Sequence, residues 1–199
     1  MTVGVWKVEE SHEYLRSMFQ DFSIYEEGYA RFTSDKRKVE WLAVRALLKE
    51  LCGEEKSVSY YPSGKPYLTD GSARISFSHT QGYVAVAVHP CKEVAVDIEQ
   101  YGTRVKRVAH KFIRGDEQIP AEPLQEIQAL LLHWSAKETL YKLLDKEGVD
   151  FIRHLQVFPF ELVEEGEFVA GEPLTEQNEC FPVHYHTHPH YVLTYASRP

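Results

Sequence analysis

Apolar side chains recur every three or four positions in the stretch DKRKVEWLAVRALLKEL, residues 35–51. This period predicts an amphipathic helix, and we expect Ser34 or Asp35 to cap its first turn. The stretch LQEIQALLLHWSAKETLYKLL, residues 124–144, has the same kind of pattern. It predicts a second and longer helix, which we expect Gly148 to end.

Other segments have the composition and alternation of strands. RISFSHTQGYVAVAVHP, residues 74–90, predicts two strands that pair with each other and are joined around Ser78 to Gly82. VAVDIE, residues 94–99, predicts a buried strand, and the end of the chain, with HYVLTYA from His190, also alternates as strands do. Helices and strands therefore follow one another in a mixed α+β order.

Two segments repeat along the chain. WLAVRALLKEL from Trp41 and WSAKETLYKLL from Trp134 share Trp, Ala, Leu, Lys and Leu at matching places, and GYVAVAV from Gly82 is echoed by HYVLTYA from His190. The order of helix and then strand is the same in both cases. This repetition predicts two related α+β halves, with a site in the cleft between them.

Length and composition indicate a globular protein. The chain has 199 residues, of which 43% are hydrophobic and 13% aromatic, enough for a packed core in one large domain or two small ones. No stretch resembles a membrane span or a targeting segment, so we expect a soluble cytoplasmic protein with no membrane partner. The three widely spaced cysteines, Cys52, Cys91 and Cys180, favour neither a disulfide framework nor a cysteine zinc site.

The charge is acidic overall but locally basic. A formal net charge of -8 argues against nucleic acid as a partner. TRVKRVAHKFIR, residues 103–114, nevertheless contains no acid and five basic side chains. These are Arg104, Lys106, Arg107, Lys111 and Arg114. The cluster is either a solvated helix face or a surface for phosphates or an acidic protein partner.

Carboxylates provide the candidate chemistry. Asp97 and Glu99 would lie on the same face of their strand and would repel each other unless a cation lies between them, although a strand that runs out into a solvated turn explains them as well. Glu138 and Lys142 lie one helical turn apart, as surface ion pairs often do. Together, the three carboxylates have the ligand chemistry of a hard divalent cation, for which Mg²⁺ is the natural candidate.

At this point the motifs carry a family resemblance. VAVDIE, followed later by WSAKETLYK, resembles the paired motif of the 4′-phosphopantetheinyl transferases, (V/I)-G-(V/I)-D-x-E and (F/W)-(S/A)-x-K-E-(S/A)-x-x-K. GKPYL, FSHTQGYVAVAV and the chain length resemble the larger Sfp-type branch. The likeness extends from about Arg37 to Lys142. Ala95 stands where the family usually has Gly, and Thr139 where it has Ser or Ala.

The resemblance implies a fold and a reaction. The fold would be a monomeric pseudo-dimer of two similar α/β halves, residues 1–100 on the coenzyme A side and residues 101–199. The reaction would transfer 4′-phosphopantetheine from coenzyme A to a serine of an apo acyl or peptidyl carrier protein and release adenosine 3′,5′-bisphosphate. The alternative is a non-catalytic module of the same fold that binds coenzyme A or a carrier protein.

The resemblance also assigns residues at the reacting end. Asp97, Glu99 and Glu138 would hold Mg²⁺ against the coenzyme A pyrophosphate, and Glu138 would assist deprotonation of the incoming serine. Lys142 would neutralise charge on the leaving phosphate. We expect Trp134 to pack away from the face that carries Glu138 and Lys142.

Coenzyme A binding is assigned in the same way. Arg45 matches the family arginine near the 3′-phosphate, and Arg37 matches a basic position earlier on the same helix. Lys65 and the pair Ser78 and His79 match positions near the nucleotide and its phosphates. Lys137 also belongs to the motif, but it precedes Glu138 and points to another side of the helix, so its role stays open.

A histidine tract near the end of the chain offers a second candidate site. HYHTHPHY places His184, His186, His188 and His190 at alternate positions, which on a strand could gather imidazoles around zinc or copper. Pro189 interrupts the tract, however, and the flanking sequences indicate a hairpin with this segment at its tip. We therefore expect exposed hairpin histidines rather than a metal site.

Overall fold

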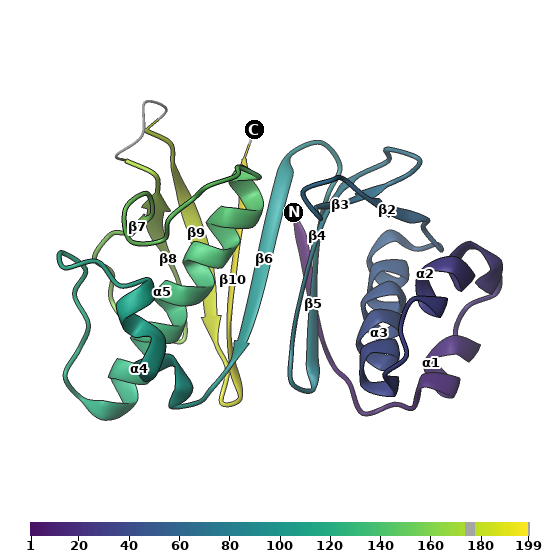
Figure 1. The fold of residues 1–199 in the computed structure, drawn as a ribbon, viewed down its shortest axis with the longest axis horizontal. Coiled ribbons are helices and arrows are strands. Elements are labelled where there is room, and N and C mark those ends of the chain that lie inside the picture. The colour runs from purple at the N-terminus through teal and green to yellow at the C-terminus, as the bar shows by residue number, and fades with distance from the viewer. Residues whose placement is uncertain (174–177, 199) are drawn as a thin grey trace.

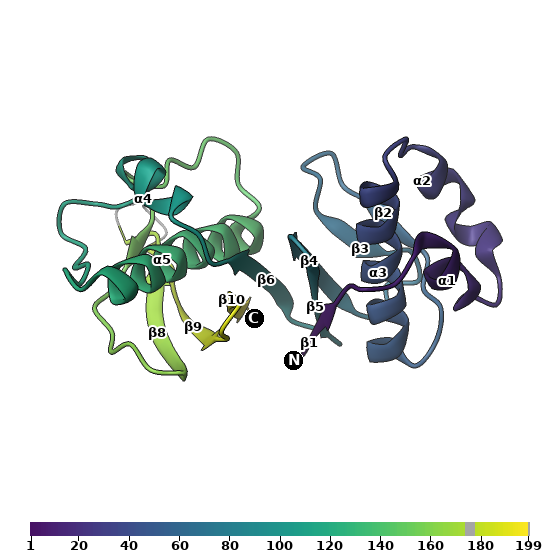
Figure 2. The same ribbon diagram turned by 90° about the horizontal axis from the view of Figure 1, so that it is seen from below.

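The structure is a computed structural model that describes residues 1–173 and 178–198. Over these residues the chain forms antiparallel sheets with the strand orders β1-β5-β4, β6-β10-β9-β8-β7 and β2-β3. Figure 1 shows the first two sheets side by side in the middle of the molecule, with helix α3 outside the smaller one and helix α5 outside the larger one. Seen from below in Figure 2, the order is again helix, sheet, sheet, helix. The mixed α+β prediction is confirmed.

The smaller sheet is built around a predicted hairpin. The strands β4 (Arg74–Thr80) and β5 (Tyr83–His89) pair as expected, and β1 (Thr2–Lys7) pairs with the other edge of β5. The helix α3 (Asp35–Cys52) confirms the first amphipathic pattern and packs on β5 and β1. The remaining elements of this part are α1 (His12–Ser17), a 3₁₀ turn (Phe22–Tyr25), α2 (Glu26–Ala30), β2 (Val58–Tyr60) and β3 (Pro66–Leu68).

The larger sheet is covered by the second predicted helix. The helix α5 (Pro123–Leu144) packs on β6 (Glu93–Gln100) and β10 (Tyr191–Arg198), which pair with each other at one edge of the sheet. The strand β6 falls inside the first predicted half, residues 1–100, yet it pairs with β10. The other elements are α4 (Arg104–Val108), a 3₁₀ turn (Ala109–Lys111), β7 (Gln156–Val157), β8 (Glu165–Gly171) and β9 (Cys180–Thr187).

A row of hydroxyl groups joins the two sheets. The backbone amides of Val96, Ile98 and Gln100 on the free edge of β6 donate to side-chain oxygens of β4. The acceptors are Ser76 Oγ at 3.2 Å, Ser78 Oγ at 3.3 Å and Thr80 Oγ1 at 3.2 Å, in that order. These side chains take the place of a neighbouring strand's carbonyls, so the edge of β6 is covered without a conventional ladder.

Three local predictions need correction. The helix α5 ends at Leu144 rather than at Gly148, because Asp145 adopts the left-handed conformation at φ 49°. Aspartate tolerates this region better than most residues, since its short polar side chain bonds locally. The β4–β5 turn is confined to residues 81–82, with Gly82 at φ 77°, so Ser78 lies within a strand. Ser34 occupies the N-cap position of α3 but makes no side-chain capping bond.

The histidine tract lies at the predicted hairpin. His184 and His186 belong to β9, and residues 188–190 connect it to β10, which confirms the hairpin. The expectation of exposed histidines holds for His190 but is wrong for His184, His186 and His188, which are partly buried. His184 Nδ1 lies 3.1 Å from Glu167 Oε2, and His186 Nε2 lies 3.9 Å from Glu165 Oε1. Among the described residues, no helix has both the length and the apolar character needed to cross a membrane.

Candidate active site

One face of α5 carries the side chains that meet β6. Trp134, Glu138 and Lys142 are spaced four residues apart, so they lie above one another on the helix surface. Trp134 Nε1 donates to Glu99 Oε1 at 2.7 Å, and Lys142 Nζ donates to Asp97 Oδ1 at 2.8 Å. The expectation that Trp134 packs away from this face is therefore wrong, and the four-residue spacing was the signal that could have revealed its role.

Asp97 is the most constrained carboxylate of the site. It is 4% exposed, and its Oδ1 accepts from Lys142 and from Ser78 Oγ at 2.9 Å. Its Oδ2 is buried and has no hydrogen-bond partner in the described part of the chain. Since leaving a buried charged oxygen unsatisfied is costly, this atom is suited to bind a cation.

The two glutamates are half-buried, and their surroundings raise the pKa of each carboxyl group. Burial, reinforced by the charge of Asp97, raises the pKa of Glu99 to about 7, although the Trp134 hydrogen bond opposes the shift. Burial and then Asp97 also raise the pKa of Glu138, and Lys142 opposes this. A divalent cation would remove the unfavourable desolvation and repulsion that these shifts express.

The donor chemistry of Asp97, Glu99 and Glu138 thus fits a hard cation such as Mg²⁺. In this structure the three carboxylates do not surround a single position as the ligands of one ion. Asp97 is instead hydrogen-bonded to Lys142, and Glu99 to Trp134. Within residues 1–173 and 178–198, no group of three or more His, Cys, Asp or Glu side chains has that arrangement. The three carboxylates share one electrostatic neighbourhood, and Mg²⁺ binding stays a prediction.

Arg45 forms the second polar feature, on α3. It is 3% exposed, its guanidinium carbon lies 4.0 Å from the centroid of the Trp41 ring, and Nη2 donates to Tyr60 Oη at 2.7 Å. Its Nε is buried and has no hydrogen-bond partner among the described residues. Arg45 lines a pocket of about 270 Å³ that also contains Arg37 and His79, so this pocket has the charge to bind an anion.

Arg37 and His79 come together at the rim of this pocket. Arg37 Nη1 lies 2.6 Å from His79 Nε2 and donates to Glu40 Oε2 at 2.9 Å. Burial lowers the pKa of His79, Glu40 opposes this shift, and the charge of Arg37 reinforces it. Because a guanidinium group can only donate, His79 Nε2 accepts from Arg37 in this contact.

Lys65 lies in a neighbouring pocket. Its Nζ is 2.6 Å from Glu93 Oε2, and it lines a space of about 400 Å³ together with Tyr141 and Lys142. Gly64, Pro66 and Phe77 line both pockets, so the two lie on either side of the same loop. Of the residues assigned to coenzyme A, Arg37, Arg45 and His79 thus share one pocket, and Lys65 is nearer to Lys142.

Ser78 contacts the carboxylates rather than facing a pocket. It is 7% exposed, and its hydroxyl binds Asp97 and the amide of Ile98. Its position in β4, opposite β6, fixes one side of Asp97. The resemblance assigned Ser78 to a position near the nucleotide and its phosphates, which stays a prediction; in this structure its hydroxyl positions Asp97.

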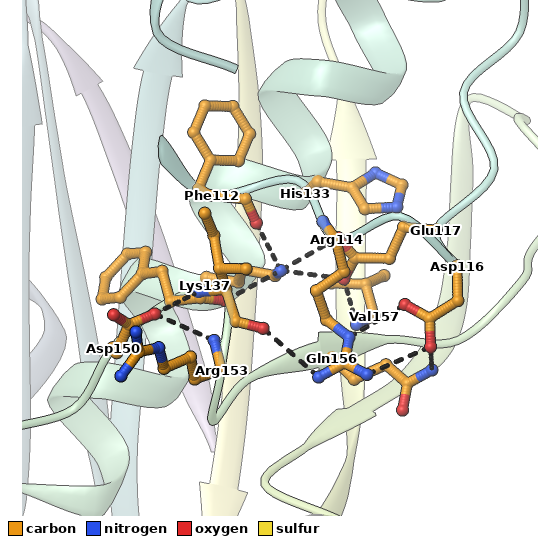
Figure 3. Close-up of polar contacts among 12 residues, drawn as sticks. Phe112, Arg114, Asp116, Glu117, His133, Lys137, Asp150, Arg153, Gln156 and Val157 are labelled. Carbon is orange, nitrogen blue, oxygen red and sulfur yellow. Dashed lines mark hydrogen bonds and ion pairs between the residues drawn. The ribbon is translucent and has the colours of Figure 1, made fainter. Parts of the chain in front are cut away.

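Lys137 is buried in the protein, where its ammonium meets Glu117 and the Phe112 carbonyl (Figure 3). Its Nζ donates to the carbonyls of Phe112 at 2.6 Å and Phe151 at 3.1 Å, and it lies 2.8 Å from Glu117 Oε1. Burial lowers the pKa of Lys137, and the hydrogen bond to Glu117 opposes that shift. Sequence reasoning missed Glu117, because nothing in its local sequence marks it as buried.

A protein-family model matches the part of the chain that contains these carboxylates. Residues 93–196 match the model of the 4′-phosphopantetheinyl transferase superfamily, from the first residue of β6 into β10. The chain belongs to this superfamily. The match includes Asp97, Glu99, Glu138 and Lys142, and membership indicates a transferase that acts with coenzyme A and carrier proteins. No protein in the curated collection matches the chain.

The hydroxyl row allows a test of how Ser78 supports Asp97. Ser76→Ala and Ser78→Ala each remove one acceptor for a β6 amide, but only Ser78→Ala also removes a donor to Asp97. We expect Ser78→Ala to lower the free energy of unfolding at neutral pH by about 1 kcal/mol more than Ser76→Ala. Urea denaturation measures both losses.

The excess loss should disappear in an Asp97→Ala background, because the carboxylate that accepts the bond is then absent. Equal losses for the two serine variants in the wild-type background would show that the hydrogen bond between Ser78 and Asp97 contributes nothing to stability.

Proposed function

We propose that this protein is an Sfp-type 4′-phosphopantetheinyl transferase, which transfers the 4′-phosphopantetheine group of coenzyme A to a serine of an apo carrier protein in a Mg²⁺-dependent reaction. Adenosine 3′,5′-bisphosphate is the second product. The observation that carries the proposal is Asp97, a buried carboxylate with one oxygen held by Lys142 and Ser78 and the other without a hydrogen-bond partner among the described residues.

The two-halved character of the Sfp-type branch is part of the proposal. It is supported by the order β1, α3, β4, β5 in the first sheet, which corresponds to β6, α5, β9, β10 in the second. In each case the last strand pairs with both of the other two. Because β6 pairs with β10, we propose the boundary of the halves in the turn at residues 90–92 rather than at residue 100, with the pseudo-dimer formed by a single chain.

The reacting end of the site would use carboxylates from β6 and from the face of α5 that packs on it. Asp97, Glu99 and Glu138 would hold the Mg²⁺ ion, which when bound neutralises charge on the pyrophosphate of coenzyme A. The carrier serine oxygen forms a bond to the phosphorus that bears pantetheine, and the bond from that phosphorus to the oxygen of adenosine 3′,5′-bisphosphate breaks. Glu138 would accept the serine proton, as a positioned carboxylate can in general acid–base catalysis.

Lys142 would act on the leaving group. Its ammonium is held by Asp97 and by the carbonyl of Val96 at 3.0 Å, so little reorganisation would be needed if negative charge develops on a phosphate beside it. Lys142 also lines the pocket that contains Lys65. We propose that the phosphates of coenzyme A run along this pocket.

The nucleotide end would lie in the pocket of Arg45. The buried guanidinium, with its Nε lacking a hydrogen-bond partner in the described chain, is a ready donor for the 3′-phosphate. Arg37 and His79 at the rim would contact the nucleotide or its phosphates. Both pockets meet at Gly64, Pro66 and Phe77, so one extended ligand could reach from Arg45 to Lys142.

The carrier protein would dock on α4. Lys106 is bound to Glu126 at 2.5 Å, and Arg114 to Asp116 at 2.9 Å, so two charges of the basic cluster are neutralised internally. Arg104, Arg107 and Lys111 are exposed, and no ion pair joins them to any of the described residues. They follow β6 directly, and an acidic partner would be attracted to them despite the net charge of -8.

The decisive experiment is incubation with coenzyme A, Mg²⁺ and a panel of apo carrier proteins, followed by intact-mass measurement of each carrier. We expect one or more carriers to gain a phosphopantetheine group. Asp97→Ala and Glu138→Ala should each lower the rate at least about 100-fold, since removing a metal ligand withdraws several kcal/mol of charge stabilisation.

Glu50→Ala, which removes an exposed glutamate of α3, is the matched control and should retain the wild-type rate. Transfer at the full rate in metal-free conditions, or by Asp97→Ala, would refute the proposed mechanism. Binding of coenzyme A without modification of any carrier would favour the non-catalytic module instead.

A second prediction concerns the 3′-phosphate. Arg45→Ala should weaken binding of coenzyme A by about 10- to 100-fold, the range for a lost hydrogen bond to a charged group, and should weaken 3′-dephospho-coenzyme A much less. Titration calorimetry with both ligands measures the difference. The dephosphorylated ligand controls for any effect on the fold, and equal losses for both would place the 3′-phosphate elsewhere.

A third prediction concerns the carrier surface. Arg107→Glu and Lys111→Glu should raise the KM for the carrier protein and leave the KM for coenzyme A nearly unchanged, and the wild-type reaction should slow as salt screens the encounter. Lys92→Glu, the same charge change in an exposed residue beyond the other end of β6, is the control. A change confined to the KM for coenzyme A would contradict docking at α4.

A further inference from the structure

Trp134 is held between two aromatic rings. Its ring centroid lies 5.2 Å from that of Phe112 and 5.5 Å from that of Phe151. Phe112 comes from the segment before α5 and Phe151 from the loop after it, so the indole is fixed by residues far from it in sequence. The indole N–H is directed at Glu99 Oε1, at 2.7 Å. The orientation of this donor therefore depends on both phenylalanines.

Lys137 fixes the backbone of both phenylalanines. Its Nζ donates to the Phe112 carbonyl, as Figure 3 shows, and to the Phe151 carbonyl. Lys137 follows Trp134 by less than one turn along α5. An ammonium group has three donors, and Glu117 takes the third. One buried cation thus ties together the two segments whose rings enclose the indole.

Glu117 completes this arrangement. Its carboxylate accepts from Lys137, from the amide of Arg114 at 2.8 Å and from the amide of Val157 at 2.8 Å. The side chains of Lys137 and Glu117 are both 0% exposed. A buried ion pair is seldom more stabilising than apolar side chains of the same size, so its function here is more readily explained by the geometry that it imposes.

We propose that Lys137, paired with Glu117, is a positioning residue that fixes Phe112 and Phe151 around Trp134, so that the indole N–H holds Glu99 in place as a metal ligand. Trp134 occupies Oε1 of Glu99, which leaves the second oxygen for the ion. A hydrogen-bonded partner of this kind orients a ligating carboxylate before the metal arrives. This inference rests on the proposed function, because it assumes that Glu99 binds Mg²⁺.

The first test removes only the donor. Trp134→Phe keeps an aromatic ring between Phe112 and Phe151 but loses the N–H group. We expect Mg²⁺ to bind at least about 10-fold more weakly to this variant, as for other losses of a ligand-orienting partner, when it is titrated calorimetrically into protein saturated with coenzyme A. No carrier protein is present, so the measurement does not depend on turnover.

The matched control is Trp6→Phe, because Trp6 Nε1 also donates to a carboxylate, Glu10 Oε1, at 3.3 Å and away from the site. This variant should bind Mg²⁺ as the wild type does. Wild-type affinity for Mg²⁺ in Trp134→Phe would overturn the proposal.

The second test addresses Lys137. Lys137→Met combined with Glu117→Gln removes both charges together and avoids leaving one charge buried alone. The indole ¹H–¹⁵N signal of Trp134, assigned by its absence from Trp134→Phe, should shift toward its position in Glu99→Gln, and Mg²⁺ affinity should fall. An unchanged signal and affinity would overturn the role of Lys137.

Phe151→Leu provides the same readout if the double variant does not fold, because it removes one ring and keeps the carbonyl that binds Lys137. Its Trp134 signal should also shift, and wild-type signal and affinity in this variant would overturn the proposal.

If the wild type modifies carriers while Trp134→Phe binds Mg²⁺ normally, the inference fails and the proposed function stands. If the wild type neither binds Mg²⁺ with coenzyme A nor modifies carriers, the proposed function fails, and with it the metal role of Glu99.

Discussion

The row of hydroxyl groups between β4 and β6 is the interaction on which the site depends. The strand β6 pairs with β10 along one edge, and its other edge would leave amides unsatisfied at the centre of the molecule. Ser76, Ser78 and Thr80 satisfy them with side chains, which keeps β4 one side-chain length away. Because the acceptors are hydroxyl groups, each still has a proton to donate.

Ser78 uses that remaining proton on Asp97. The same oxygen accepts from the Ile98 amide, so the junction of the two sheets and the orientation of the carboxylate are set by one side chain. From the other side, Lys142 reaches the same Asp97 oxygen from α5. Asp97 is thus fixed by β4 and α5 together, and its Oδ2 is the atom left for a cation, having no bond to any described residue.

Local patterns in the sequence predicted the elements, but long-range contacts decide what the site residues do. The periods of α3 and α5 and the alternation of β4 and β5 were sufficient to find them, and four-residue spacing brought Glu138 and Lys142 to one face. No local pattern indicates that β4 adjoins β6, so the bond of Ser78 to Asp97 could not be predicted from the sequence.

The importance of Glu117 could not have been predicted for a similar reason. Its partners are Lys137, twenty residues later, and Val157, forty residues later, and both contacts require the finished fold. Asp145 illustrates the opposite case. A glycine three residues later was the stronger stop signal, but the helix ended at the first residue that could adopt the left-handed conformation.

Thr139, which stands where the resembled family has Ser or Ala, keeps a hydroxyl group at this position, as Ser would. Thr139 Oγ1 lies 2.7 Å from Thr194 Oγ1, and Ser135 Oγ lies 2.8 Å from the same atom, all in the buried interface of α5 with β10. Thr194 is the cross-strand partner of Asp97. The Thr139 hydroxyl therefore adds a hydrogen bond that anchors α5 beside Asp97. Glu138 and Lys142 lie on the same helix, so this bond also fixes their position relative to the Asp97 carboxylate.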